Sequence, residues 1–286
     1  MGRRVIALVA VGIGLVAASA WAQSGQVVLG TTVYALHGLP SDAITGFTVT
    51  CPPAYFAVSA GVSRPAPGTT LLSVRPVGLR AFTFRFGNPV TNDATRVAVA
   101  VACRKTTGGP VFKLKPVETR VVVKPGQIKS GTLTCPPQTT PAGVAVDLDP
   151  RRARSVDSFA GAALNVRTST ASLRAFQIRI ANAGDDAHDV LVQGNCATVL
   201  LASDIERARL NTKISTYTDL IAPGRHHVLH RCPSGWTGLG AGYALNSVSV
   251  RIDGAAAIDA NGSWWARNTA ASPVPARLQL ICARLG

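Results

Sequence analysis

The six cysteines are the residues of this chain whose spacing points most clearly to chemistry, and that chemistry is disulfide formation. Three of them stand directly before a proline, and each of these is followed 50 to 61 residues later by one further cysteine. None belongs to a Cys-x-x-Cys pair, the close spacing that zinc sites usually use. Six cysteines allow fifteen pairings, but each segment holds its own first and last cysteine, which selects one pairing. We therefore predict the disulfides Cys51–Cys103, Cys135–Cys196 and Cys232–Cys282.

Histidines and acidic residues could bind a metal ion, but their spacing does not favour it. His226 and His230 would share one face of a strand, yet the standard rise per residue places them about 13 Å apart. His227 would point to the opposite face. The acidic run at residues 185–189 could hold calcium, but it lies in a turn-rich segment, and two corresponding segments elsewhere lack such a cluster. We predict no metal site and no cofactor.

The sequence contains none of the short motifs that mark common catalytic sites. It has no Gly-x-Ser-x-Gly elbow, no His-Glu-x-x-His pair and no glycine-rich phosphate loop. Only 14 acidic residues and 5 histidines are available for acid–base work. We predict a non-enzymatic protein, and an exported enzyme stays a third hypothesis because active sites combine distant residues.

The formal charge of +15 is spread along the chain rather than concentrated in one stripe. Nucleic-acid binders usually gather basic residues beside exposed aromatic residues, so we predict no specific nucleic-acid partner. An evenly basic surface favours loose binding of polyanions, such as acidic polysaccharides. The densest basic run, in a predicted surface loop, is a candidate polyanion contact: Arg151, Arg152 and Arg154.

Two adjacent tryptophans are the most interesting candidates for ligand contact. Trp264 takes a position that is apolar in the other segments, so we predict that it packs in the core. Trp265 takes the position of Arg85 and Arg179, which we predict to be on the surface. An exposed Trp could stack on a sugar ring or dock against a partner. Trp265, Arg85 and Arg179 therefore join the candidate ligand contacts.

The elements that carry these residues show the period of a strand. Residues 82–86 read Phe-Thr-Phe-Arg-Phe and residues 176–180 read Phe-Gln-Ile-Arg-Ile, so each predicts a strand with one buried face. A turn-rich segment and a second apolar strand then lead to the closing cysteine, which predicts a β-hairpin. The proline after each first cysteine should end a further strand. Each hairpin turn begins near an asparagine: Asn88, Asn182 or Asn268.

This pattern occurs three times and predicts an all-β protein of three tandem, disulfide-pinned β-sandwich repeats with five or six strands each. It resembles the immunoglobulin-like (Ig-like) repeats of bacterial secreted proteins. In those repeats a strand ending in Asn, as at residues 85–88, precedes a polar loop and a valine-rich strand, as at residues 97–101. The resemblance covers most of the mature chain and implies a sandwich fold. The alternative is a single threefold β-prism, in which each cysteine-to-cysteine segment supplies one four-stranded sheet.

The N-terminal residues have the features of a secretory signal. Arg3 and Arg4 precede an apolar run at 5–18, and small residues follow at Ala20 and Ala22. Export predicts a secreted, extracellular or periplasmic protein without a transmembrane anchor after cleavage. A capping-box pattern at residues 203–206 predicts a short helix in the second linker. The predicted division is a signal peptide at 1–22, β repeat 1 at 23–103, a linker at 104–118, β repeat 2 at 119–196, a linker with the helix at 197–214, and β repeat 3 at 215–286.

Two functions of different classes fit these features. The first is a structural or assembly protein of the cell exterior, which would associate with itself or with other cell-surface proteins. The β-prone segment at residues 26–36 could pair with an open sheet edge of a neighbouring chain. The second is an extracellular carbohydrate- or polyanion-binding module that uses Trp265 and basic strand faces.

Overall fold

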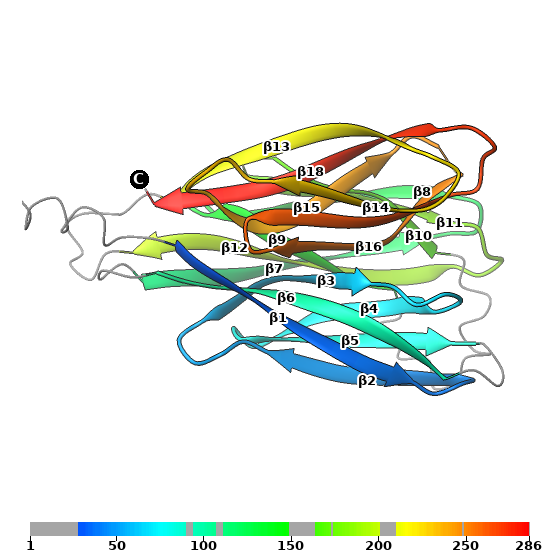
Figure 1. Cartoon of the computed structure of the whole chain (residues 1–286), viewed down its shortest axis with the longest axis horizontal. Helices are drawn as coiled ribbons and strands as arrows, with labels where there is room; N and C mark the ends of the chain where they lie inside the picture. The colour runs from blue at the N-terminus through cyan, green and yellow to red at the C-terminus, as the bar shows by residue number, and fades with distance from the viewer. Residues whose placement is uncertain are drawn as a thin grey trace, which may run out of the picture.

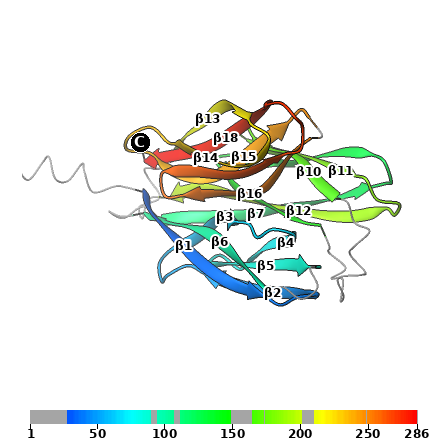
Figure 2. The same ribbon diagram turned by 45° about the vertical axis from the view of Figure 1, so that its right-hand side comes forward.

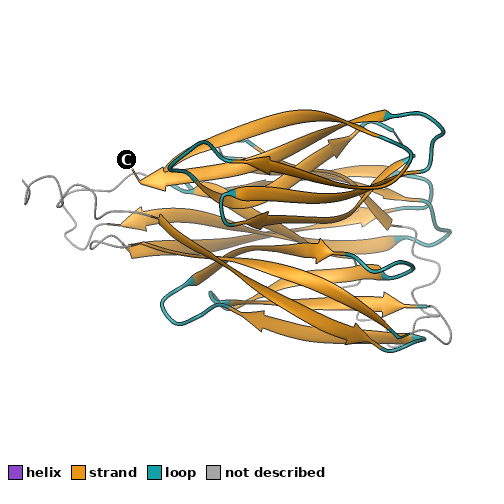
Figure 3. Cartoon of the chain, viewed as in Figure 1, coloured by secondary structure: helices purple, strands orange, loops and turns teal. Residues whose placement is uncertain are grey.

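The computed structural model describes residues 28–89, 94–106, 111–148, 164–172, 174–200, 210–247 and 249–285. Over these residues the protein is all-β, with strands joined by turns and no helix (Figure 3). Most strands run along the longest axis of the molecule (Figure 1). The strands are β1 (Val28–Leu39), β2 (Ala43–Thr50), β3 (Phe56–Arg64), β4 (Thr70–Val77), β5 (Ala81–Asn88), β6 (Thr95–Thr106), β7 (Val111–Val123), β8 (Ile128–Thr134), β9 (Thr140–Asp147), β10 (Leu164–Ala171), β11 (Ala175–Asn182), β12 (His188–Leu200), β13 (Leu210–Ile221), β14 (Gly224–Arg231), β15 (Thr237–Leu245), β16 (Val250–Ile258), β17 (Asn261–Asn268) and β18 (Val274–Leu285).

Strand pairing divides the chain into three units, which we call unit 1 (β1–β6), unit 2 (β7–β12) and unit 3 (β13–β18). In each unit the sixth strand lies between the first and the third, as in β1-β6-β3, β7-β12-β9 and β13-β18-β15. The fifth strand lies between the second and the fourth, as in β2-β5-β4, β8-β11-β10 and β14-β17-β16. All these pairs are antiparallel. Each unit therefore contributes two three-stranded layers.

The predicted disulfides are confirmed. Cys51–Cys103, Cys135–Cys196 and Cys232–Cys282 are bonded, with Cα–Cα distances of 5.7, 5.7 and 5.8 Å. Each first cysteine directly follows the second strand of its unit, β2, β8 or β14, at the Cys-Pro turn, and each partner lies in the sixth strand of the same unit. All six are buried, so each bridge joins the two layers of a unit through its core.

Alternating side chains explain why these segments form half-buried strands. In β5, Phe82, Phe84 and Phe86 are buried whereas Thr83 and Arg85 are only partly buried. In β11, the apolar residues at 176, 178 and 180 are buried and the polar residues between them are exposed. The predicted period of two is therefore confirmed in these two strands, and the same alternation buries Trp264 in β17.

The three recurring asparagines are buried and hold the end of the first strand of each unit. The Nδ2 atoms of Asn88, Asn182 and Asn268 donate hydrogen bonds to the backbone oxygens at the ends of β1, β7 and β13, over 3.2, 3.0 and 2.7 Å. A buried amide without such partners would be costly, so the asparagines have a structural role at these three positions. Their recurrence in the sequence reflects this structural role.

The units share sheets and a common centre. β4 pairs with β9, and β10 pairs with β15, so two six-stranded sheets each combine strands of neighbouring units. At the centre, the third strands of the units meet, and Val58, Ala142 and Leu239 are all fully buried there. The approach is close: a Cβ on Gly143 would lie 2.5 Å from the Val58 oxygen. Turning the molecule shows the three units packed against one another along their length (Figure 2).

Two segments predicted as connectors lie partly in strands. The first predicted linker, 104–118, is strand wherever it is described, because β6 continues to Thr106 and β7 begins at Val111. In the predicted helix, the described residues 210–213 belong to β13. Long pairing of β13 with β18 explains this outcome, since a full ladder of backbone hydrogen bonds outweighs a local capping pattern. The capping box itself lies outside the described residues.

Candidate binding site on unit 3

The candidate ligand contacts from the sequence do not come together in one place. Arg85 lies on β5 of unit 1, beside a groove of about 550 Å³ that also contains Arg75 and the buried Asp147. Arg179 is exposed on β11 of unit 2, and Trp265 lies on β17 of unit 3. The run Arg151, Arg152 and Arg154 lies outside the described residues.

Trp265 is half-buried, and its polar atom already has a partner. Its ring stacks on His227, with 4.4 Å between ring centroids and an interplanar angle of 10°. Its Nε1–H donates to the Ser63 backbone oxygen of unit 1 over 2.5 Å. Burial lowers the pKa of His227, which favours its neutral form. Trp265 therefore joins unit 3 to unit 1, which differs from the lone exposed tryptophan that the sequence suggested.

On the outward face that carries Trp265, three arginines form a row across the β14-β17-β16 layer. Arg225, Arg267 and Arg251 are direct cross-strand neighbours. All three contact Asp253: Arg267 Nη2 lies 2.8 Å from Asp253 Oδ2, Arg251 Nε lies 3.4 Å from Oδ1, and Arg225 Nη2 lies 3.8 Å from Oδ2. We call these four residues the arginine row.

The arginine row carries an excess of positive charge that is open to solvent. The Asp253 side chain is 10% exposed, whereas those of Arg225, Arg267 and Arg251 are 34%, 41% and 48% exposed. Three guanidinium groups against one carboxylate leave a local charge of about +2. Such a cluster suits a carboxylate, sulfate or phosphate group, because guanidinium pairs these oxygens through two parallel hydrogen bonds.

A β-bulge places the acid at the centre of this row. The pairing of β16 with β17 shifts register between Ile252 and Gly254, so Asp253 is the extra residue. A bulge re-aims the side chain that it carries. The equivalent bulge between β4 and β5 carries Leu72, which is fully buried. The same backbone feature thus presents an apolar side chain in unit 1 and a carboxylate in unit 3.

The arginine row has no counterpart at the equivalent positions of the other units. By register to the recurring asparagines, unit 1 has Ile44, Gly87 and Thr70 at these places. The corresponding residues of unit 2 are Ile128, Ala181 and Asn165. The row is therefore a specific feature of unit 3.

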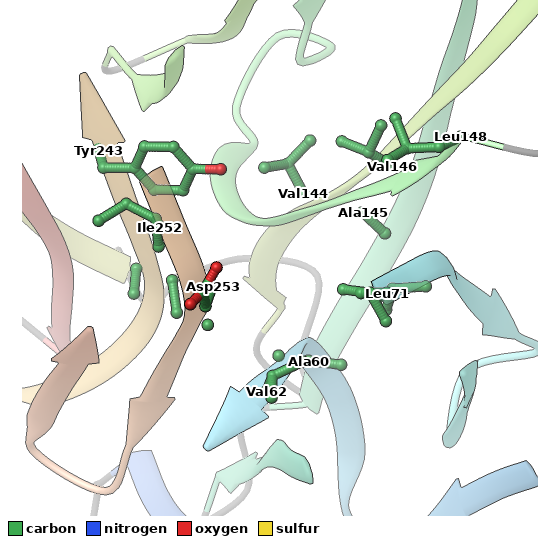
Figure 4. Close-up of a pocket in the computed structure, with 15 residues that line it drawn as sticks. Ala60, Val62, Leu71, Val144, Ala145, Val146, Leu148, Tyr243, Ile252 and Asp253 are labelled. Atoms are coloured by element: carbon green, nitrogen blue, oxygen red, sulfur yellow. The ribbon is translucent and has the colours of Figure 1, made fainter. Parts of the chain in front are cut away.

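Beside the arginine row, a small cleft opens where strands of all three units meet (Figure 4). Its volume is about 130 Å³, and a second hollow of about 100 Å³ adjoins it. The two share several lining residues, including Tyr243 and Asp253, and Arg251 lines the second. We call the two together the axial cleft. Its other apolar walls are formed by Ala60, Val62, Leu71, Val144, Val146, Leu148 and Ile252.

The histidines that the sequence singled out occupy separate settings. His230 Nε2 lies 2.6 Å from Asp219 Oδ2, and the His230 ring stacks on Tyr217 at 3.8 Å. His226 Nε2 lies 3.1 Å from the Pro223 oxygen. Among the residues that the structure describes, no group of three His, Cys, Asp or Glu side chains could hold a metal ion.

Comparisons with known proteins supply no family for this chain. No protein-family model matches it, and no curated protein matches it significantly. Within the described residues there is also no helix long and apolar enough to cross a membrane. The function must therefore be argued from the site itself.

The arginine row and Tyr243 were not predicted from the sequence. One signal was available: Arg267 directly precedes Asn268, where the other segments have Gly87 and Ala181 before their asparagines. The alignment of Arg225 and Arg251 with Arg267 depends on two strand registers, one of which contains a bulge. Those registers are not visible in a single sequence.

Proposed function

We propose that this protein is an exported, non-enzymatic binding protein of the cell exterior that recognises an anionic polymer, such as an acidic glycan, through the arginine row of unit 3. The observation that carries the proposal is the convergence of Arg225, Arg251 and Arg267 on the single carboxylate of Asp253. Repeated anionic groups on a polymer would complete the charge balance that Asp253 leaves open. The stacked pair of Trp265 and His227 on the same face offers an aromatic edge beside the row.

Two features support placement outside the cytosol. The N-terminal sequence has the order of a secretory signal, and all six cysteines are bonded. Disulfides persist in oxidising compartments, which include the cell exterior and the periplasm.

The architecture that we propose is three copies of one unit arranged about a common pseudo-threefold axis, rather than separate Ig-like beads. Equivalent residues, seven positions after each first cysteine, meet at the buried centre as Val58, Ala142 and Leu239. The fourth strand of each unit also lies beside the third strand of the next, as β4 with β9, β10 with β15 and β16 with β3. Solution scattering should give one compact body, and an extended string of three bodies would contradict this arrangement.

Binding to immobilised heparin and polygalacturonate, with neutral dextran as a blank, tests the proposed function. A variant with Arg225→Gln, Arg251→Gln and Arg267→Gln should bind both polyanions at least about tenfold more weakly, with a smaller dependence on salt. The control removes the same charge from exposed arginines elsewhere, through Arg174→Gln, Arg179→Gln and Arg277→Gln. Equal losses in the two variants would show only general charge attraction and would reject the site.

A structural or assembly role is the second candidate, and the edge strand β1 favours it. β1 is the outer strand of β1-β6-β3, so one side of its backbone is not paired within that sheet. It carries two exposed apolar side chains, Tyr34 at 54% and Leu36 at 60%. Open, apolar edges favour pairing with another chain. Replacing both with lysine should abolish any concentration-dependent rise in light scattering, and a wild-type protein that stays monomeric at millimolar concentration would rule out self-assembly.

A further inference from the structure

We propose that the axial cleft binds a compact apolar group whose attached anionic group lies on the arginine row, so that the ligand is an amphipathic anion such as an aryl or short alkyl carboxylate or sulfate. The inference rests on the proposed function, because it uses the same arginines. It adds a second contact, made by uncharged walls, that a simple polyanion site would not need.

The size and lining of the cleft suit one small apolar group. Its main hollow, about 130 Å³, is close to the engineered cavity of roughly 150 Å³ that binds benzene in another protein. Val144, Val146 and Leu148 form one wall, and Leu71, Ala60 and Val62 form another (Figure 4). Transferring a ring or short chain from water to such walls is favourable in proportion to the apolar area covered.

Unit 3 supplies the polar side of an otherwise apolar cleft. Val62, Val146 and Tyr243 occupy equivalent positions, each eleven residues after the first cysteine of its unit. Two of the three are valines, and the third brings a hydroxyl group that points toward Val144 in the close-up (Figure 4). Asp253 likewise replaces the apolar Leu72 of unit 1. A few convergent polar groups in an apolar cleft are typical of small-molecule sites.

Charge decides which kind of apolar ligand fits. Asp253 lines both hollows, and it is already engaged by Arg225, Arg251 and Arg267. Arg251 lines the second hollow. An anion in the second hollow would be attracted by the excess positive charge, whereas a neutral group would gain nothing from it and a cation would be repelled. The ligand therefore carries its negative charge next to its apolar group.

Three probes separate the parts of this proposal: benzoate, benzyl alcohol, which keeps the ring without the charge, and acetate, which keeps the charge without the ring. Titrations would be followed by calorimetry and by methyl NMR shifts. We expect benzoate to bind at least about tenfold more tightly than either control and to shift the methyl signals of Val144, Val146 and Leu148. Benzoate should also displace heparin, since the two anions share the arginines.

Two variants test the residues. Val144→Phe fills the cleft and should abolish benzoate binding while heparin binding is retained, and Val77→Phe, at an exposed position, serves as the control. Tyr243→Val restores the residue of the other units and should weaken benzoate about threefold or more. Thermal unfolding of each variant reports whether it is folded, and the wild-type methyl shifts stand as a test that needs no variant.

The outcomes distinguish this inference from the proposed function. Equal affinity for benzoate and acetate, or for benzoate and benzyl alcohol, would overturn the amphipathic ligand. So would methyl shifts that avoid the cleft. If benzoate does not bind but the arginine variant still binds heparin more weakly, the inference is rejected and the proposed polyanion site is retained. If heparin binding does not depend on the arginines, the proposed function is rejected.

Discussion

The three junctions between units are closed by different means. Units 1 and 2 meet where β4 pairs with β9, and units 2 and 3 meet where β10 pairs with β15, so backbone bridges join them. Units 3 and 1 meet where β16 lies beside β3, but these strands remain edges of two separate three-stranded sheets. We call this third contact the closing junction.

At the closing junction, where β16 and β3 are not paired, side chains supply the polar contacts between the units. Arg104 of β6 is buried and donates from Nε to the Gly238 oxygen over 2.8 Å and from Nη2 to the Asp259 oxygen over 3.1 Å. Ser59 Oγ donates to the Leu239 oxygen, and the Trp265 indole donates to the Ser63 oxygen. These contacts join residues more than 130 positions apart in the sequence.

Burial lowers the pKa of Arg104 to about 10, while the nearby charge of Asp259 raises it. The side chain therefore remains a cation at neutral pH, held almost entirely by backbone carbonyl groups. Its counterparts after the closing cysteines of units 2 and 3 are Ala197 and Ala283. Where strand pairing does not join two units of the same topology, a buried side chain such as Arg104 links them through backbone carbonyl groups.

Among substitutions at the closing junction, Arg104→Ala should destabilise the protein most. It leaves the buried carbonyl of Gly238 without its arginine donor, removes one of the two donors to the Asp259 carbonyl and opens a cavity, so the free energy of unfolding should fall by about 4 kcal/mol. Chemical denaturation measures the change. Arg96→Ala, at an exposed site on the same strand, is the control and should change little. A loss below about 1 kcal/mol would mean that Arg104 does not hold the junction.

Gly61→Ala tests the close approach of β3 to β16. A Cβ at Gly61 would lie 1.7 Å from the Ala255 oxygen, so the two backbones must separate, at an expected cost of about 3 kcal/mol. In Gly46→Ala the nearest atom would be 3.6 Å away, an ordinary contact, so this control should be close to neutral. Similar melting temperatures for the two variants would contradict the packing at the closing junction.

Trp265→Phe keeps an aromatic ring against His227 but removes the hydrogen bond to Ser63. We expect a loss of about 1 kcal/mol, and about 2 kcal/mol for Trp265→Ala, since part of the stacked surface also goes. Denaturation by urea would measure both. If alanine and phenylalanine cost the same, stacking contributes nothing and only the hydrogen bond links the units.

Thr32→Val tests the solvent-exposed rim of the closing junction. Thr32 Oγ1 donates to Asp259 Oδ1 over 3.1 Å and accepts from the Asp259 N–H over 3.0 Å. Because water replaces such exposed bonds, the expected loss is about 0.5 kcal/mol. A loss as large as that for Arg104→Ala would place the strength of the junction at its rim rather than in its buried part.

The smallest effect is a pH dependence at His227. Its pKa in the folded protein is lowered, so the unfolded chain binds the proton more readily. Stability should therefore fall as the pH drops through the unfolded value near 6.5. Melting curves at pH 7.5 and pH 5 measure this, and His227→Gln should reduce the difference. A variant that loses as much stability on acidification as the wild type would assign the effect to other groups.

Much of the fold could be predicted because its signals are local or repeated. The alternation at residues 82–86 reports a strand directly, and one cysteine pair per segment fixed the disulfides. The helix prediction was wrong over residues 210–213 because a capping pattern carries no information about the partner strand β18. Trp265 was expected on an open surface but is half-buried. Ser63, which lies about 200 positions earlier, approaches it only in the folded protein.

The candidate site was less predictable than the fold. The arginine row needs two cross-strand registers and a bulge before Arg225, Arg251 and Arg267 become neighbours of Asp253. The axial cleft needs strands from all three units. Neither the arginine row nor the axial cleft has a short sequence motif, because each is formed by residues on several different strands.

The strands, the disulfide pairs and the recurring asparagines follow from the amino-acid sequence, because each depends on side-chain alternation or on a pattern that the chain carries three times. How the units close around their centre, and where one acid collects three arginines, emerges only in the folded protein. Those outcomes depend on register and on long-range packing, in which a shift of a single residue moves every side chain of a strand to the other face.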